Sequence, residues 1–291
     1  MHSTAQARRR FIHRILVINP GSTSTKVAVF EDEQPLFVET LRHSSQELAI
    51  FPHILDQYEF RLQSIQELIL SRGIRASSLA AVVARGGLLR PIPSGTYFVN
   101  KKMVDELRCR DAERQHASGL GAPLADEIAG LVGVPALIVD PVCVDEFDDL
   151  ARVSGLPEIE RRSLSHALNL KAVARRAAKD LARPYSELNL VITHMGGGIS
   201  VTAHHRGKMV DVNQALDGTG PFSPERVGGL PIGDVMRMSY SGQYTYDQLF
   251  RKYEGHGGLV AQLGTNDARE VQQRIAEGDQ QAKLVYEAMA Y

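Results

Sequence analysis

Two patterns of apolar and polar positions alternate along this 291-residue chain. Short runs rich in β-forming residues predict strands, and apolar residues with helical spacing predict helices. The first pattern predicts strands over residues 15–19, 25–31, 35–40, 79–84 and 136–140, and again over 188–194, 199–205 and 208–212. The second predicts helices over 48–71, 101–109, 120–131, 166–181, 267–277 and 280–291. Together they indicate an α/β fold.

One arrangement of elements occurs twice. The segment "LVINPGSTSTKVAVFEDEQPLFV" begins at Leu16, and "LVITHMGGGISVTAHHRGKMVDV" begins 174 residues later, at Leu190. In each, an apolar strand enters a turn of small residues and a predicted hairpin follows. Few residues are identical, so chance is the alternative, but the shared layout favours two related domains. We therefore predict an N-terminal extension over 1–14, one domain over 15–141 and a second over 142–291.

The two small-residue turns have the composition of anion-binding loops. Glycine lets backbone N–H groups converge on an anion, and short hydroxyl side chains add donors. The first turn offers Ser22, Thr23, Ser24, Thr25 and Lys26, and the second offers His194 before three glycines. The alternative for the first turn is an ordinary turn with polar side chains, and the alternative for the second is a flexible bend. Neither turn matches a Walker loop or a Rossmann glycine motif. Their matching positions in the repeat favour phosphate binding.

Four ionisable residues lie at the ends of predicted strands, at the start of a predicted helix or in a loop of small residues. Arg85 and Asp140 each come at the end of a predicted strand, where α/β sheets bind ligands. His166 begins a predicted helix, and Arg226 lies in the loop "GTGPFSPERVGG". The plainer alternatives are a surface arginine, a turn-forming carboxylate and a capping or packed histidine. Two arginines and a histidine near one site would suit a reaction that develops negative charge on a transferring group.

Composition narrows the class of protein. The chain is 43% hydrophobic and 23% charged, with a net charge of −1, which disfavours nucleic acid as a partner. Its longest apolar run is too short to span a bilayer, and its basic first fourteen residues lack the apolar core of a secretory signal. Two cysteines in no metal-binding spacing fit a reduced, cytoplasmic setting.

Eight motifs, in order along the chain, carry a resemblance to a known family. They are "INPGSTSTK", "ARGGLLRPIPSGTY", "QHASGLGAPLA", "IVDPV", "SHALNLKAVAR", "HMGGGISV", "GPFSPERVGGLP" and "LGTNDAREV". The chain resembles the acetate and butyrate kinase family of the actin-like ATPase, sugar kinase and Hsp70 superfamily. The motifs "ARGGLLRPIPSGTY" and "SHALN" are similar to those of its butyrate kinase branch.

The resemblance implies a fold and a reaction. The expected fold has two duplicated actin-like, ribonuclease H-like domains with a nucleotide cleft. The expected reaction transfers the γ-phosphoryl group of ATP, with Mg²⁺, to butyrate or another short-chain carboxylic acid, giving an acyl phosphate and ADP. Because a carboxylate is already nucleophilic, we expect direct in-line transfer without a phosphoenzyme. The resemblance also implies a homodimer or a larger homo-oligomer.

The same resemblance implies which residues bind phosphate and nucleotide. The first loop would bind phosphate, with Asn19 also positioning Mg²⁺, and the second loop would bind phosphate through its histidine and glycines. The motif "TNDAR" would lie on the adenosine side. The residues so implied are Asn19, Ser22, Ser24, Lys26, His194, Gly196, Gly197, Gly198, Asp267 and Arg269.

Five further residues are implied to act in catalysis. Arg85 and Arg226 would hold the carboxylate and stabilise the planar phosphoryl group in transfer. Asp140 would support Mg²⁺ or orient the arginines. His166 would contact the phosphoryl group, with His116 a second histidine near it.

The chain departs from the family pattern in two places. Its last predicted helix keeps apolar spacing up to Tyr291 without a stop signal, whereas family members continue with a further strand and helix block. We therefore expect a truncated second domain, and the alternative function is binding of nucleotide or acid without turnover. A sugar kinase on this fold is a third hypothesis, disfavoured because a hydroxyl acceptor normally needs a carboxylate base. Ser165 stands where relatives have an aromatic residue, and either widens the acyl pocket or is repacked.

Overall fold

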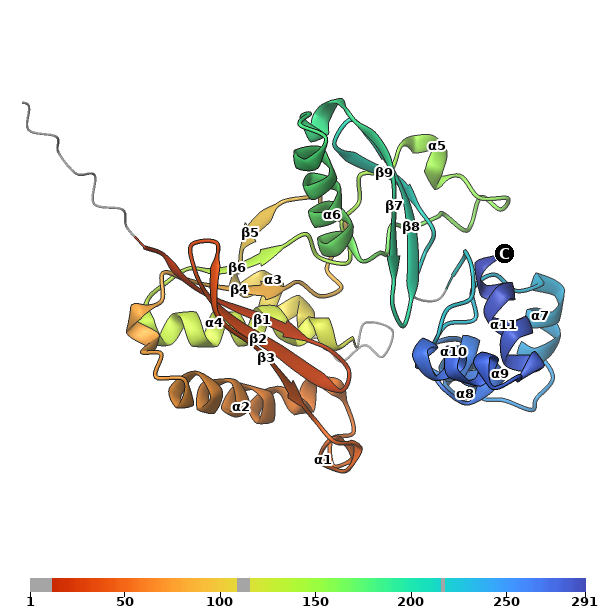
Figure 1. Ribbon diagram of the computed structural model, residues 1–291, viewed down its shortest axis with the longest axis horizontal. Coiled ribbons are helices and arrows are strands. Elements are labelled where there is room, and N and C mark those ends of the chain that lie inside the picture. The colour runs from red at the N-terminus through yellow and green to blue at the C-terminus, as the bar shows by residue number, and fades with distance from the viewer. Residues whose placement is uncertain (1–11, 109–115, 216–217) are drawn as a thin grey trace, which may run out of the picture. The chain divides into compact units, whose positions relative to one another are not determined.

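The chain divides into two compact units in a computed structural model that describes residues 12–108, 116–215 and 218–291. Unit 1 comprises Met1–Arg90 and Gly95–Pro141, and unit 2 comprises Pro91–Ser94 and Val142–Tyr291. Figure 1 shows the strands and helices of each unit. The prediction of an α/β fold is confirmed, since each unit combines a sheet with helices.

Unit 1 is built on a six-stranded sheet of order β3-β2-β1-β4-β6-β5. The first three strands, β1 (Arg14–Pro20), β2 (Ser24–Glu31) and β3 (Gln34–Arg42), form an antiparallel meander. Strands β4 (Ala81–Arg85) and β6 (Ala136–Val139) run parallel to β1, and β5 (Thr96–Phe98) closes the sheet antiparallel to β6. The carboxyl ends of β1, β4 and β6 therefore meet at one edge of the sheet.

Two helices of unit 1 share the main apolar core with the sheet. Helix α2 (Tyr58–Ser71) contributes Ile65 and α4 (Gly121–Val132) contributes Leu124, and both pack against buried strand residues such as Leu16. Helix α3 (Lys101–Leu107) joins a smaller cluster around Ile138. The remaining helical segments among the described residues of this unit are α1 (Ser45–Ala49) and the 3-10 turns Ile54–Gln57, Ala76–Ser78 and Ala117–Leu120.

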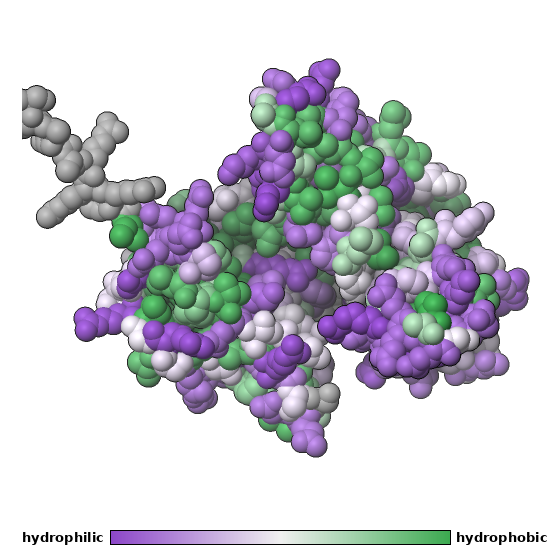
Figure 2. Space-filling view, in the orientation of Figure 1, coloured by the Kyte–Doolittle hydropathy of each residue, from purple (hydrophilic) through white to green (hydrophobic). Residues whose placement is uncertain are grey.

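Unit 2 begins with a three-stranded antiparallel sheet of β7 (Asn189–Met195), β8 (Ile199–His205) and β9 (Lys208–Val212). Helix α6 (Ala167–Asp180) packs Leu170 and Ala174 against its inner face. Val191, Met195 and Val201 are exposed, and Figure 2 shows apolar surface over this sheet. Two short segments, α5 (Asp149–Arg152) and a 3-10 turn (Tyr185–Glu187), complete this part.

The C-terminal part of unit 2, from α7 onward, is mainly helical. It consists of α7 (Ile232–Ser239), α8 (Tyr246–Tyr253), α9 (Gly258–Leu263), α10 (Ala268–Ala276) and α11 (Gln280–Ala290). The buried residues Leu259, Val271, Ala282 and Val285 form the core of α9, α10 and α11. No helix among the described residues combines the length and apolarity needed to cross a bilayer.

The repeated strand, turn and hairpin is confirmed in both units. Strands β1, β2 and β3 have the same order and antiparallel pairing as β7, β8 and β9. In each case a short turn of small residues joins the first two strands, at 21–23 in unit 1 and at 196–198 in unit 2. The two candidate phosphate loops therefore occupy equivalent places.

Some predicted helices were wrong in their limits. The helix predicted over 48–71 is three segments, α1, a 3-10 turn and α2. Pro52 explains the break, because proline lacks an N–H group and disfavours helical geometry at the preceding residue. The helix predicted over 101–109 ends at Leu107, and its last predicted residue lies outside the described residues. Helices α7, α8 and α9 were not predicted.

Candidate functional site

Three predicted site residues of unit 1 lie at the carboxyl ends of adjacent parallel strands. Ile18 pairs with Ala84, and Arg85 pairs with Val139, so Asn19, Arg85 and Asp140 end β1, β4 and β6 at the same sheet edge. Asn19 also faces Lys26 across the β1–β2 ladder. Because directly opposed residues project from the same face of a sheet, the amide and the ammonium are neighbours. Both side chains are exposed.

The first loop presents its polar groups to solvent. The N–H group of Gly21 donates to the carbonyl of Ser24 over 2.7 Å, which closes a tight turn. Ser22 and Thr23 are exposed within this turn, whereas Thr25 is fully buried beneath it. The loop therefore offers hydroxyl groups outward, as phosphate binding requires.

Arg85 lies in a partly buried position beside a closely packed helix start. Burial lowers the pKa of its guanidinium, and among the described residues no carboxylate forms an ion pair with it. A Cβ at position 121 would overlap the carbonyl oxygen of Arg85, so only glycine allows α4 to begin here. Close packing thus fixes the backbone that carries Arg85.

Asp140 is held rigidly and almost completely buried, with 1% of its surface exposed. Its Oδ1 accepts a hydrogen bond from the Gly95 N–H group over 2.8 Å, and its own N–H donates to the Gly95 carbonyl over 3.0 Å. Its φ of 39° is rare for a residue other than glycine and indicates backbone strain. Strain of this kind is found at functional sites.

The oxygen groups at this edge suit Mg²⁺, which prefers hard oxygen ligands and is usually bound by one or two carboxylates, phosphate oxygens and water. Asp140 and Asn19 supply one carboxylate and one amide oxygen from strands of the same sheet. No group of three or more histidine, cysteine, aspartate or glutamate side chains among the described residues is arranged to hold a metal ion by itself.

His116 caps the 3-10 turn that leads into α4. Its Nδ1 accepts from the Ser118 N–H group over 3.2 Å and lies 2.7 Å from the Ser118 hydroxyl. The neutral ring therefore carries its proton on Nε2. The predicted second histidine is thus oriented by Ser118.

In unit 2, the two predicted histidines are stacked on each other. The ring centroids of His166 and His194 are 3.9 Å apart, with an angle of 12° between the planes. His166 Nδ1 lies 2.9 Å from the hydroxyl of Ser200, and His194 Nδ1 lies 2.9 Å from the amide oxygen of Asn169. Since an amide oxygen only accepts, His194 Nδ1 carries a proton.

The glycine loop after His194 is fastened to the loop that carries Arg226. The carbonyl oxygen of Gly197 accepts from the Ser223 hydroxyl over 2.6 Å and from the Glu225 N–H group over 3.0 Å. A Cβ at position 197 would lie 2.8 Å from Oε2 of Glu225, so a larger residue here would displace that carboxylate. A Cβ at position 198 would lie 3.4 Å from Cε1 of His166. The histidine pair and the glycine loop are therefore neighbours.

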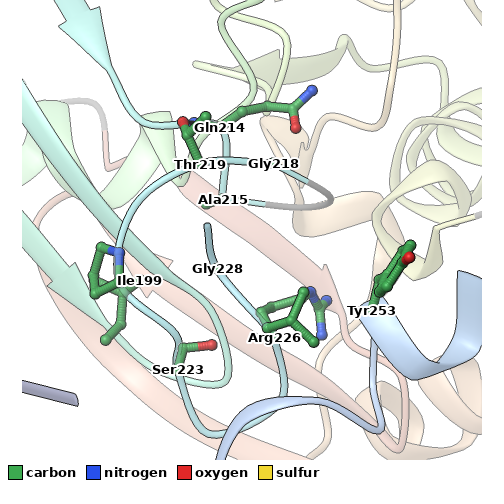
Figure 3. Close-up of a pocket in the computed structure, with 11 residues that line it drawn as sticks. Ile199, Gln214, Ala215, Gly218, Thr219, Ser223, Arg226, Gly228 and Tyr253 are labelled. Atoms are coloured by element: carbon green, nitrogen blue, oxygen red, sulfur yellow. Dashed lines mark hydrogen bonds between the residues drawn. The ribbon is translucent and has the colours of Figure 1, made fainter. Parts of the chain in front are cut away.

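Arg226 lines a pocket in unit 2 and is partly neutralised there. Its Nη2 lies 3.1 Å from Oε1 of Glu254, and its Nη1 lies 3.7 Å from Oε2 of Glu225. Its Nε is buried without a hydrogen-bond acceptor. The pocket is small and partly open to solvent, and Figure 3 shows Arg226 and Tyr253 on one side of it. Its other lining residues are Ile199, Gln214, Ala215, Gly218, Thr219, Pro221, Ser223, Val227 and Gly228.

Asp267 and Arg269 are paired with each other. Asp267 caps α10 by accepting from the Arg269 N–H group over 2.9 Å, and its Oδ2 lies 2.7 Å from Arg269 Nη2. These hydrogen bonds lower the pKa of Asp267 to about 2. Their neighbour Asn266 donates to Oε1 of Glu225 over 2.7 Å, which links this motif to the Arg226 loop. The predicted adenosine residues thus have a structural role as a helix cap.

Sequence reasoning missed the residues that orient the predicted ones. Asn169 and Ser200 hold the histidines, and Ser223 and Glu225 hold the glycine loop. Asn169 lies inside the motif "SHALN" and Glu225 inside "SPER". Their positions in these motifs were the signal from which the sequence could have identified them. Ser165 is buried with its hydroxyl 3.8 Å from the Met209 sulfur, so it is packed in the core of unit 2.

Comparison with known proteins gives a family match for the C-terminal part of the chain. Residues 159–291 match the model of the Acetokinase family. This segment includes the histidine pair, the glycine loop, Arg226 and the Asp267–Arg269 pair.

Solved structures resemble the chain over nearly its whole length. The propionate kinase from Francisella tularensis subsp. tularensis SCHU S4 has a TM-score of 0.74 and 20% identity, covering 96% of this chain and 77% of its own. The Porphyromonas gingivalis acetate kinase has a TM-score of 0.71 and 18% identity, covering 94% and 75%. The Entamoeba histolytica acetate kinase has a TM-score of 0.65 and 16% identity, covering 94% and 74%. The chain therefore has the α/β fold of these three kinases.

Proposed function

We propose that this protein transfers the γ-phosphoryl group of ATP to a short-chain carboxylate. The observation that carries the proposal is the match of residues 159–291 to the Acetokinase family. The fold shared with acetate and propionate kinases supports it. So do the two loops of small residues at equivalent places in the repeat.

The proposed reaction is a direct displacement. A carboxylate oxygen of the acid forms a bond to the γ-phosphorus, the bond from that phosphorus to the bridging oxygen breaks, and ADP leaves with the electron pair. No general base is needed, because the attacking oxygen is already ionised. The obstacle is the repulsion between two anions, which fixed cations and hydrogen-bond donors lower. Mg²⁺, held through Asn19 and Asp140 together with phosphate oxygens, would neutralise charge on the β- and γ-phosphates.

We assign unit 1 to phosphate and acid binding. Its exposed loop supports phosphate contacts by Ser22, Ser24 and Lys26, and the partly buried Arg85 is a cation without an ion pair to any described carboxylate. Asp140 would help to hold the ion and would orient the arginines. His116, oriented by Ser118, would present Nε2–H as a donor.

We assign unit 2 to the transferring phosphoryl group and the nucleotide. His166 and the glycine loop of 196–198 would contact phosphate oxygens, with His194 stacked behind His166. Arg226 would stabilise the planar phosphoryl group from its pocket. Asp267 and Arg269 would border the adenosine, which fits their place beside the Asn266–Glu225 link.

We propose butyrate as the preferred acid, on the resemblance of "ARGGLLRPIPSGTY" and "SHALN" to the butyrate kinase branch. One methylene changes binding by only about 1–3 kcal/mol, so related acids should also react at lower efficiency. We also propose that the protein acts as a homodimer or larger assembly.

The test is formation of acyl phosphate by this chain. The protein is incubated with ATP, Mg²⁺ and acetate, propionate, butyrate or isobutyrate, and the product is trapped with hydroxylamine. We expect the highest kcat/KM with butyrate, and loss of the signal in Arg85→Gln. Highest efficiency with acetate would keep the reaction class and refute the substrate. ATP binding without product from any acid would support binding without turnover instead.

A further inference from the structure

The buried underside of the first loop is occupied by a single arginine. Arg61, in α2, has none of its surface exposed. Its Nη1 donates to the Ser24 carbonyl over 3.0 Å and to the Thr25 hydroxyl over 2.9 Å. Its Nη2 donates to the Ser22 carbonyl over 3.0 Å and to Gln57 Oε1 over 2.8 Å, and its Nε donates to the same oxygen over 3.1 Å. All five guanidinium hydrogens thus have acceptors.

Every one of these acceptors is neutral. No ion pair joins Arg61 to a carboxylate within the described part of the chain, whereas the other fully buried cation, Lys171, is paired with Glu146. A buried charge without a counter-ion is costly, and proteins rarely keep one without a reason. Burial lowers the pKa of Arg61 to about 10, which still leaves the guanidinium charged at neutral pH.

The neighbouring histidine does not add a second charge at neutral pH. His43 Nε2 lies 3.0 Å from the Thr25 hydroxyl, and the His43 N–H group donates to the Thr23 carbonyl over 2.9 Å. Burial and the charge of Arg61 lower the pKa of His43, so its ring is neutral. The underside of the loop therefore carries one positive charge, that of Arg61.

The hydrogen bonds of Arg61 also set the direction of the loop. The carbonyl groups of Ser22 and Ser24 point inward to the guanidinium. In a trans peptide the following N–H group points the opposite way, so the Thr23 N–H group faces outward. The exposed side chains of Ser22 and Thr23 lie on that outer side. An anion bound there would lie roughly 8 Å from the guanidinium, with one peptide layer between them.

We propose that Arg61 is a positioning residue for the phosphate of ATP. It fixes Ser22–Thr25 so that the donors of the loop face outward, and its buried charge attracts the phosphate from behind. The missing counter-ion of Arg61 is then the bound phosphate itself. This inference rests on the proposed function, since it concerns the ATP site of the same reaction.

The experiment compares ATP and AMP binding by calorimetry in the wild-type chain, Arg61→Met and Arg61→Lys, with KM and kcat from the hydroxylamine assay. Each variant is first checked for folding by circular dichroism and thermal unfolding. A matched control is the double variant Lys171→Met/Glu146→Gln, which removes a buried cation and its partner elsewhere. The control tests whether loss of any buried cation weakens ATP binding.

We expect Arg61→Met to weaken ATP binding by about tenfold or more and AMP binding by less, because the attraction grows with phosphate charge. Arg61→Lys should recover part of the loss, because it keeps the charge but not the five-donor geometry. The KM for ATP should rise more than kcat falls, and the control should keep its ATP affinity within about twofold.

Three outcomes would overturn the inference. The first is a folded Arg61→Met with wild-type ATP affinity. The second is a loss of affinity that is the same for ATP and AMP, or the same in the control variant as in Arg61→Met. Either result would indicate that Arg61 has a purely structural role. If Arg61→Met does not fold, Arg61→Lys decides, and wild-type ATP affinity and KM in it would refute the proposal. A wild-type chain that binds no ATP would refute the proposed function as well, which separates the two failures.

Discussion

The two stacked histidines of unit 2 are oriented by neutral side chains. Asn169 accepts from His194, and Ser200 lies beside His166. Each contact fixes the position of one edge of an imidazole ring. At the scale of single residues, the site depends on hydrogen bonds that fix which nitrogen carries a proton.

The first prediction concerns Asn169 as a positioning residue. Asn169→Ala leaves His194 Nδ1 without its acceptor, so the ring should turn and kcat should fall by about 10–100-fold, with the KM for the acid nearly unchanged. Asn169→Asp keeps an acceptor oxygen and should recover most of the rate. The measurement is steady-state acyl phosphate formation. The exposed Asn189→Ala is the control, and an unchanged kcat in Asn169→Ala would contradict the prediction.

At the scale of elements, close packing of α4 on β4 carries Arg85. The start of α4 tolerates no Cβ at position 121, because the Arg85 carbonyl occupies that space. Later in the same helix, a Cβ added at Gly130 would meet no other atom within 4 Å, and the φ of Gly130 is not positive. The two glycines therefore differ in environment while sharing one helix.

This pair gives a stability prediction. Gly121→Ala should lower the free energy of unfolding by about 1–3 kcal/mol or more, because the added methyl group meets the Arg85 carbonyl. Gly130→Ala should raise it by up to about 1 kcal/mol, because alanine favours the helix. Urea unfolding followed by circular dichroism measures both. Equal effects of the two changes would show that the close approach at position 121 relaxes without cost.

The sequence predicted the repeated elements well and the short helices poorly. Runs rich in β-forming residues mark β1, β2, β7 and β9, and helical spacing marks α6, because each of these elements buries apolar residues in a core. Helix α7 is only eight residues long, and although Ile232, Val235 and Met236 have helical spacing, none of its residues is buried. The predicted site residues were named from local motifs, whereas Arg61, Asn169 and Glu225 act through contacts distant in sequence, which spacing alone does not reveal.

At the scale of the whole molecule, a buried polar network in unit 2 sets how stability depends on pH. His204 Nδ1 lies 2.5 Å from the Tyr185 hydroxyl, and its Nε2 lies 2.8 Å from the Thr202 hydroxyl. Burial and the nearby Lys171 lower the pKa of His204 to about 4, against 6.5 for an ordinary histidine, while Glu146 acts in the opposite sense. The folded protein therefore keeps this ring neutral.

Stability should fall as the pH drops from about 6.5 to about 4. In that range the unfolded chain takes up a proton at His204 and the folded chain does not, so the stabilisation present above pH 6.5 is lost. The total is on the order of 3 kcal/mol at most. Urea unfolding at several pH values measures it. His204→Gln should flatten this dependence, and the exposed neighbour His205→Gln should leave it unchanged.

The order of strands in unit 2 has a consequence for the protein in concentrated solution. Strand β7 is hydrogen-bonded to β8 on one side, and no described strand pairs with its other side. One row of its amides therefore has no strand partner among the described residues, and it lies beside the exposed Val191 and Met195. Hydrogen exchange should be fast along that row and slow along the row shared with β8. The same edge is a template on which another extended chain can add, so aggregation should begin at β7.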